Sequence, residues 1–179
     1  MTANRLCRPL LTAAAVLLLL PWAAAAAEPL DADFTGVFVQ SFGTGPDGTD
    51  DLYFAGPGQA APLGSAFVLG HSTTRPDPDM PGCSEIVTDR VVLTGEGGDE
   101  IWLENSGDDC LDLSVPGRVF IRGTGTFAVV GGTGRYKRAT GSGEFNVVAE
   151  VLQFAPDGAW AAGTFQLSFT GTVSRPGAR

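Results

Sequence analysis

Three positive charges lie within four residues of this sequence, at Arg135, Lys137 and Arg138, and Tyr136 stands between them. Guanidinium and ammonium groups bind carboxylates and phosphates, and an aromatic ring offers a face on which a ligand can stack. Arg135, Tyr136 and Lys137 are therefore candidate ligand-binding residues. The alternative is a solvated turn whose charges are balanced by nearby acids such as Glu144.

The sequence offers little for metal or nucleophilic chemistry. His71 is the only histidine, which excludes an all-histidine metal site, and no G-x-S-x-G motif accompanies it, so we interpret it as structural. Acidic residues recur in residues 47–51, 77–79, 99–100 and 108–109. Oxygen-rich loops can bind Ca²⁺, but none of these has the spacing of a calcium loop, and we interpret them as solvated turns. We expect no cofactor and no metal.

Two further patterns concern ligands. Residues 123–128 fit the dinucleotide fingerprint G-x-G-x-x-A, but the apolar, β-prone run that follows cannot supply the helix N-terminus that binds a pyrophosphate. Trp102 and Trp160 fall in strand-like runs, and we expect them in the core or in the lining of a cavity, where aromatic rings pack first and contact ligands second.

The elements that must position these residues are strands. Phe165, Leu167 and Phe169 alternate with polar residues, as do Phe145 and Val147. Turn residues rich in Gly, Pro and Asp separate such runs, and the segment 155–158 has proline second and glycine fourth, which is typical of a β-turn. Other predicted strands cover residues 34–42, 52–55, 63–72, 111–115 and 119–130, the last with a break near Gly123.

Seven to nine short antiparallel strands predict an all-β domain, either a sandwich or a closed barrel. Many positions on the expected inward face carry small residues, which would leave room for a ligand; they are Gly36, Ala66, Gly125, Ala149 and Gly163.

The cysteines Cys83 and Cys110 flank two predicted strands, residues 85–94 and 100–105, joined by a glycine-rich turn at 95–98. Folding about that turn places residues whose numbers sum to 193 opposite each other, and 83 and 110 have this sum. We predict a disulfide at the base of the hairpin. Zinc is the alternative, but two thiolates without a nearby histidine are too few ligands.

The N-terminus has the order of a secretory signal: Arg5 and Arg8, then an apolar run at residues 9–22, then small residues up to Ala27. The run is shorter than the roughly 20 residues that cross a bilayer. We predict a signal peptide at 1–27 and one domain at 28–179, exported to the periplasm or secreted. Residues 28–179 hold nine basic residues against 20 acidic ones, a net charge of −11, which disfavours nucleic acid and anionic membranes as partners.

Residues 127–136 read Phe-Ala-Val-Val-Gly-Gly-Thr-Gly-Arg-Tyr and continue to Ala139-Thr140-Gly141. This stretch resembles the signature of the allene oxide cyclase and dirigent barrels, and of small secreted bacterial proteins with a similar barrel. Residues 143–152 and 163–173 resemble the closing strands of that barrel. The resemblance covers about a third of residues 28–179, and more loosely Asp50-Asp51-Leu52 with Gly56-Pro57. It implies an eight-stranded antiparallel barrel with a central cavity, and homotrimers as in the plant members.

The departures from those families concern the active site. Dirigent proteins carry an arginine where this chain has Thr140, and allene oxide cyclases carry a glutamate on the first strand, whereas residues 34–42 contain none. Asp51 is the only acid that matches, and it is the candidate catalytic residue. We expect a barrel that binds a small apolar or amphipathic ligand, or a partner, without catalysis. The alternative is a cyclase, isomerase or dirigent-like protein that guides a reactive intermediate in the cavity.

Overall fold

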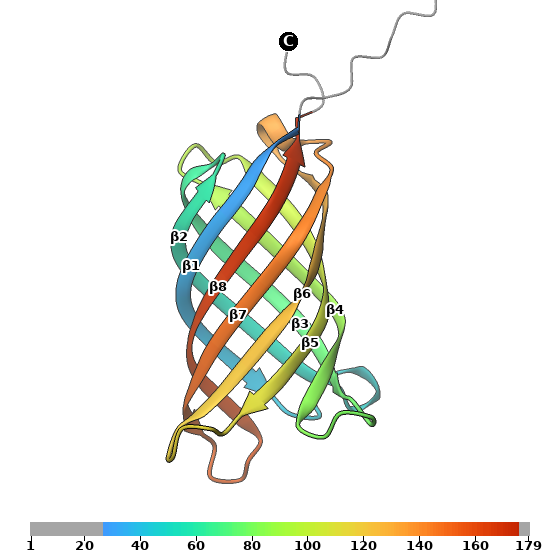
Figure 1. Cartoon of the computed structure of the whole chain (residues 1–179), viewed down its shortest axis with the longest axis vertical. Coiled ribbons are helices and arrows are strands. Elements are labelled where there is room, and N and C mark those ends of the chain that lie inside the picture. The colour runs from blue at the N-terminus through green and yellow to red at the C-terminus, as the bar shows by residue number, and fades with distance from the viewer. Residues whose placement is uncertain (1–26, 176–179) are drawn as a thin grey trace, which may run out of the picture.

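The computed structural model describes residues 27–175, and these form one closed barrel of eight antiparallel strands (Figure 1). Each strand pairs with its neighbours in sequence, and β1 pairs with β8 to close the sheet. The strands are β1 (Ala27–Ser41), β2 (Asp50–Ala61), β3 (Gly64–Pro76), β4 (Cys83–Gly95), β5 (Glu100–Asp112), β6 (Val119–Gly132), β7 (Gly141–Phe154) and β8 (Trp160–Ser174). Two 3₁₀ turns, η1 (Pro46–Gly48) and η2 (Gly134–Tyr136), lie in the connections. The predicted eight-stranded barrel is confirmed.

The alternation seen in the sequence determines which side chains point inward. In β8, Phe165, Leu167 and Phe169 are buried, and the intervening Thr164 and Gln166 are exposed. The turn before β8 has the predicted form, because the Gly158 N–H donates to the Ala155 carbonyl at 2.9 Å and Gly158 has a φ of 73°. That φ favours glycine, since a side chain would clash with the backbone there.

At several inward glycines, phenylalanine rings from neighbouring strands fill the space that a side chain would take. A Cβ on Gly163 would lie 2.8 Å from the ring of Phe38, and one on Gly70 would lie 2.0 Å from the ring of Phe54. The small inward residues expected to leave space for a ligand therefore also provide space for the barrel's own aromatic rings.

The strands are longer than expected. Residues 111–115 are not a separate strand: β5 continues to Asp112, and residues 113–118 connect it to β6. β6 passes through Gly123 without a break. The acidic pair Asp108 and Asp109, expected in a turn, lies inside β5. Local composition suggested turns at these points, but pairing with both neighbouring strands keeps the backbone extended.

Cys83 and Cys110 form the predicted disulfide, with a Cα–Cα distance of 4.0 Å. Next to the hairpin turn, paired residue numbers sum to 194, as for Thr94 and Glu100, and at the base they sum to 193. The ladder between β4 and β5 is irregular between Glu85 and Val91, and this irregularity accounts for the shift by one residue.

The two ends of the barrel differ. At the upper end in Figure 1, η2 and the ends of β1 and β8 lie over the barrel, and Tyr136 is completely buried there. Below it the largest buried side chains pack together; they include Leu30, Phe34, Leu93, Ile101, Leu103, Phe169 and Val173. The connections at 42–49, 77–82, 113–118 and 155–159 surround the lower end.

One sequence prediction falls on another part of the chain. The predicted signal peptide at 1–27 lies outside the described residues, apart from Ala27, where β1 begins. Within residues 27–175, no helix is long and apolar enough to span a bilayer.

Candidate functional site

The main cavity of the barrel has a volume of about 500 Å³ and opens at the lower end. Its lining comes from the inward positions of all eight strands near that end, and most of it is apolar. The apolar lining includes Phe38, Leu52, Phe54, Ile86, Ile121, Phe145, Val147, Ala149, Val151, Ala161, Phe165 and Leu167. This size and composition are those of protein sites for small organic molecules.

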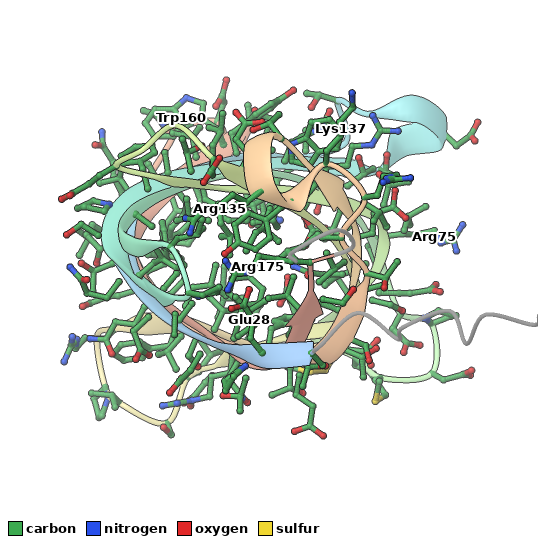
Figure 2. The ribbon with its side chains drawn as sticks, turned by 90° about the horizontal axis from the view of Figure 1, so that it is seen from above. Glu28, Arg75, Arg135, Lys137, Trp160 and Arg175 are labelled. Carbon is green, nitrogen blue, oxygen red and sulfur yellow. A yellow bond between two sulfur atoms is a disulfide. The ribbon has the colours of Figure 1, made fainter. Side chains whose placement is uncertain are left out.

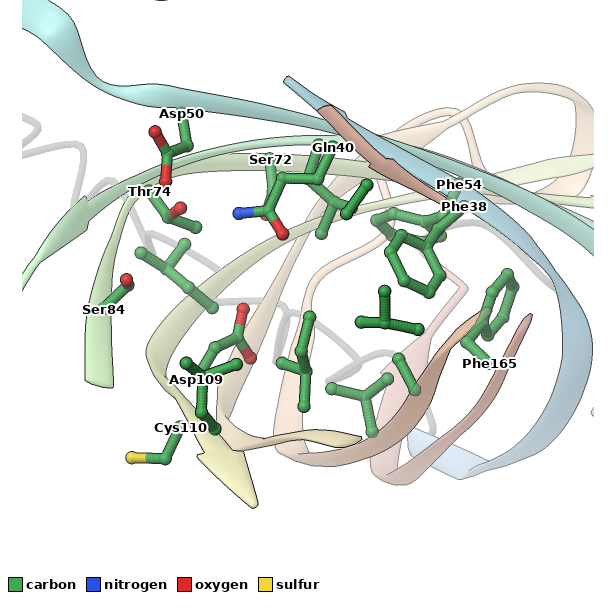
Figure 3. A pocket seen from close by; sticks show the side chains of 18 of the residues that line it. Phe38, Gln40, Asp50, Phe54, Ser72, Thr74, Ser84, Asp109, Cys110 and Phe165 are labelled. Atoms are coloured by element: carbon green, nitrogen blue, oxygen red, sulfur yellow. The ribbon is translucent and has the colours of Figure 1, made fainter. Parts of the chain in front are cut away.

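Phenylalanine rings form one side of the cavity. Phe54 and Phe165 meet edge to face with their ring centroids 5.6 Å apart, and Phe38 lies beside them (Figure 3). Edge-to-face contact fixes the orientation of both rings, because the electropositive edge of one faces the electron-rich face of the other. A ligand in the cavity would therefore meet a preformed aromatic wall.

The opposite wall contains a buried carboxyl–amide pair on β4 and β5. The Asn105 Nδ2–H donates to Asp89 Oδ2 over 2.7 Å, and the two residues are only 9% and 6% exposed. Burial raises the pKa of Asp89 to about 7, although hydrogen bonds from Asn105 and Ser72 act in the opposite direction. At neutral pH this carboxyl is therefore close to the midpoint of its titration.

Asp89 and Asn105 lie where the ladder between β4 and β5 is interrupted. A second, smaller hollow of about 220 Å³ lies at the same interruption and is lined by Val87, Thr88, Arg90 and Glu104 together with Asp89 and Asn105. The carboxyl–amide pair thus borders both hollows and bridges two strands that lack regular backbone pairing there.

A second acid, Asp109, extends into the cavity from β5 nearer the rim (Figure 3). Its cross-strand partner is Gly123, where a Cβ would lie 1.9 Å from Asp109 Oδ1, so only glycine leaves space for the carboxyl in this position. Burial, with a smaller contribution from the charge of Asp108, raises the pKa of Asp109 to about 6.

Three oxygen atoms of this wall share one property. Oδ1 of Asp89, Oδ1 of Asn105 and Oδ1 of Asp109 are buried without a hydrogen-bond partner. Buried polar atoms in proteins are nearly always paired, so each of these oxygens can accept a hydrogen bond from a water molecule or a ligand. Among the described residues that line the cavity there is no lysine, arginine or histidine.

Asp51, the candidate catalytic residue, lies outside the cavity lining. Its neighbours Asp50 and Leu52 point inward, so its carboxylate is on the outer face, where Oδ1 lies 3.0 Å from His71 Nε2. The ring of His71 also stacks on Tyr53, with centroids 4.4 Å apart. Asp51, Tyr53 and His71 form a small polar group on the outer surface.

The basic segment lies at the opposite end from the cavity. Tyr136, the last residue of η2, is buried, Arg135 forms an ion pair with Asp99, and Figure 2 places Lys137 toward the periphery of the barrel. Arg175 forms an ion pair with Glu28 beside the Tyr136 ring, 5.9 Å from its centroid. The acid that balances the charge of Arg135 is Asp99. The sequence had suggested nearby acids such as Glu144 for this role.

Neither tryptophan lines the cavity. Trp102 points outward, is 41% exposed, and donates its indole N–H to Glu100 over 2.9 Å. Trp160 begins β8 and is half-buried. The sequence suggested ligand-binding roles for these tryptophans and the basic segment, and a catalytic role for Asp51. These roles stay predictions, and none of these residues lines the cavity.

Sequence reasoning missed Asp89, Asn105 and Asp109. For Asp89 a signal was present: it shares its strand face with Val91 and Leu93, so alternation places a carboxyl on the apolar face of a predicted strand. No group of three or more histidine, cysteine, aspartate or glutamate residues in 27–175 is arranged to hold a metal ion.

Comparison with known proteins gives a limited result. A search against protein-family models finds no match, and neither does a search of curated proteins. Among solved structures, the chain matches the pterocarpan synthase dirigent protein at 14% sequence identity, over 86% of this chain and 94% of that one, with a TM-score of 0.37.

Proposed function

We propose that this protein binds a small apolar or amphipathic molecule in the cavity at the lower end of the barrel. The observation that carries the proposal is the cavity itself, whose volume of about 500 Å³ would hold a compact organic molecule. Eight-stranded barrels are just wide enough to be filled by side chains or to hold one ligand, and this barrel does the first at one end and leaves space at the other.

Apolar burial would supply most of the affinity. Each 100 Å² of ligand surface removed from water contributes about 2.5 kcal/mol, before the cost of lost translation and rotation is subtracted. The aromatic wall is preformed, so little further ordering of side chains would be needed. The polar wall at Asp89 and Asp109 would orient the ligand.

The test is a fluorescence titration with N-phenyl-1-naphthylamine, a neutral dye that brightens in apolar surroundings. Ala149 is buried and lines the cavity, so Ala149→Leu would fill part of the space without adding a polar group. Ala128 is exposed on the outer face, and Ala128→Leu adds the same atoms there as a matched control. We expect wild type and Ala128→Leu to bind the dye, and Ala149→Leu to bind it roughly tenfold more weakly, since lost space excludes apolar contact.

A dye that fails to bind, or that binds all three proteins equally, would contradict the proposal. Equal binding would place the dye on the outer surface, where several apolar side chains such as Leu69 and Leu152 are exposed.

A catalytic role is the second candidate, and the two cavity acids favour it. A carboxyl with a pKa of about 7 can hold a proton at neutral pH and deliver it to a bound intermediate, which general acid catalysis requires. A cyclase, isomerase or dirigent-like activity would then depend on Asp89 or Asp109 and not on Asp51. Screening cyclisable substrates with wild type, Asp89→Asn and Asp51→Asn would test this. Loss of product in Asp89→Asn alone supports the catalytic role of the cavity, and loss of product in Asp51→Asn alone contradicts it.

We also propose that the protein functions outside the cytoplasm, in the periplasm or after secretion. The Cys83–Cys110 disulfide supports this, because such bonds persist in oxidising compartments. Fractionation of the producing cells tests it: the protein should appear in the periplasmic or culture fraction, and a reduced cytoplasmic form would contradict it.

A further inference from the structure

Four buried polar atoms without a partner belong to residues that line the cavity: Oδ1 of Asp89, Asn105 and Asp109, and the hydroxyl oxygen of Thr74. Three of the four are carboxyl or amide oxygens, and the Thr74 hydroxyl can accept as well as donate. Asp89 and Asn105 are more than nine-tenths buried, so bulk water does not reach them freely. A ligand that satisfies the Oδ1 atoms of Asp89 and Asn105 must therefore bring hydrogen-bond donors.

The charge of the cavity points the same way. Asp50, Asp89 and Asp109 line it, and among the described lining residues no basic side chain faces them. Burying a carboxylate without a counter-charge is costly, which is why burial raises the pKa of Asp89 and Asp109. A cation placed in the cavity would remove that cost, whereas an anion would add to it.

The charged groups around Asp89 do not already supply this cation. On β3, His71 exerts a weak attraction, but its ring lies on the outer face and pairs with Asp51. On β5, Asp109 repels the Asp89 charge. Arg90 and Glu104, of opposite sign, line the small hollow on the other side of the strand interruption.

We propose that the cavity selects a ligand with a protonated amine, bound so that the ammonium contacts Asp89 and Asn105 and the apolar part lies against the phenylalanine wall. An ammonium group has three donors and one positive charge, which fits the Asp89 carboxylate and the orphaned amide oxygen of Asn105. Phe38, Phe54 and Phe165, on the opposite side, add favourable ring faces for the alkyl or aryl part of the ligand. This inference rests on the proposed function and specifies the ligand class.

The experiment compares three probes of similar size in the folded protein by isothermal titration calorimetry: 2-naphthylmethylamine, 2-naphthylmethanol and 2-naphthoate. We expect the amine to bind at least roughly tenfold more tightly than the alcohol, because it pairs with a desolvated carboxylate, and the carboxylate probe to bind most weakly. At pH 6 the amine should also release protons on binding, since its charge favours ionised Asp89; the alcohol should release none.

Variants locate the site. Asp89→Asn keeps the shape of the side chain and removes its charge, so it should lower amine affinity roughly tenfold and reduce the proton release, with Asp109 supplying what remains. Asp109→Asn, nearer the rim, should lower amine affinity by a smaller factor, about threefold. Asp33→Asn removes the same charge from the exposed outer face of β1 and should change neither quantity.

The outcomes separate this inference from the proposed function. Equal affinity for amine and alcohol would overturn the amine specificity and leave small-molecule binding intact. Failure of all three probes to bind would overturn both. An amine preference of the same size in Asp89→Asn as in wild type would overturn the assignment of the site and mean that Asp89 and Asn105 only bridge the interrupted strands.

Discussion

The two ends of this barrel are built from the same eight strands, yet one is solid and the other hollow. At the upper end, Tyr136 of η2 is completely buried, and residues such as Leu30, Leu93 and Val173 belong to the same buried cluster. At the lower end, the inward positions include Ala149 and Ala161 and the polar residues Asp89 and Asp109, and a cavity remains. The difference shows that side-chain size along each strand, and one connecting segment, decide where a ligand can enter.

Surface charges and cavity charges are used differently. Near the surface, acids and bases pair at both ends: Arg135 with Asp99 and Arg175 with Glu28 at the closed end, Arg118 with Glu150 and Arg122 with Asp112 toward the open end. At the open end, Asp89 and Asp109 have no basic partner among the described lining residues. Paired charges near a surface serve structure, whereas unpaired buried carboxyls lower stability and are retained most easily where they meet a ligand.

The largest effect on this comparison should come from removing the aromatic ring that closes the upper end. Tyr136→Ala deletes a completely buried side chain, and we expect it to lower the free energy of unfolding by about 3–5 kcal/mol. Urea denaturation measures this. Tyr136→Phe is the matched control: it removes only a hydroxyl that has no hydrogen-bond partner, so stability should stay the same or rise slightly. A loss below about 1 kcal/mol in Tyr136→Ala would mean that the ring does not seal the barrel.

At the open end the strongest constraint is the disulfide. Replacing Cys83 and Cys110 together by serine should lower the free energy of unfolding by roughly 3–4 kcal/mol, because the unfolded chain regains the freedom that the closed loop had removed. Thermal or urea unfolding of the variant checks this, with reduced wild-type protein as the control of matching stability. If the variant and the oxidised wild type unfold together, the rim is held by strand pairing alone.

The third prediction concerns pH and the acids of the cavity. The folded-state pKa of Asp89 is about 7, above its ordinary value of 3.8, so between these pH values the folded protein binds more protons than the unfolded chain. Stability contributed by this group is therefore present at low pH and is lost as pH rises toward 7. Asp89→Asn should be nearly neutral at pH 4 and stabilising by about 2–4 kcal/mol at pH 8.

Urea denaturation of both proteins at the two pH values measures this difference. Asp33→Asn, on the exposed outer face, should give the same small change at pH 4 and pH 8. A stabilisation by Asp89→Asn that does not depend on pH would contradict the protonation argument.

The smallest effect should follow from changes on the outer surface. Asp51→Asn breaks the ion pair with His71, whose side chains are 20% and 43% exposed, and exposed pairs contribute about 0–1 kcal/mol. We expect no change in the affinity of the cavity for N-phenyl-1-naphthylamine. Loss of binding in Asp51→Asn with normal stability would show that the outer face, and not the cavity, carries the function.

The fold could be predicted from the sequence because its determinants are local. Alternation in residues 164–170, the turn at 155–158 and the spacing of Cys83 and Cys110 each depend on a few neighbouring residues. The residues of the cavity could not be predicted in the same way. Asp51 was a candidate because it matches a family motif. Side chains alternate between the two faces of β2, however, and this alternation places Asp51 on the outer face beside His71. Asp109 resembled part of an acidic turn, and only its pairing with Gly123 across the sheet shows that it lies in a strand and points inward.

By itself, the sequence of this protein determined an all-β chain with two bridged cysteines, because alternation of apolar residues and turn chemistry act over a few residues. The tertiary structure alone decided which end of the barrel is open and which acids face its interior. Those properties depend on barrel closure, on the interruption between β4 and β5, and on the position of η2 over one end. The burial of Asp89, and hence its raised pKa, exists only once residues from β3, β4 and β5 surround it.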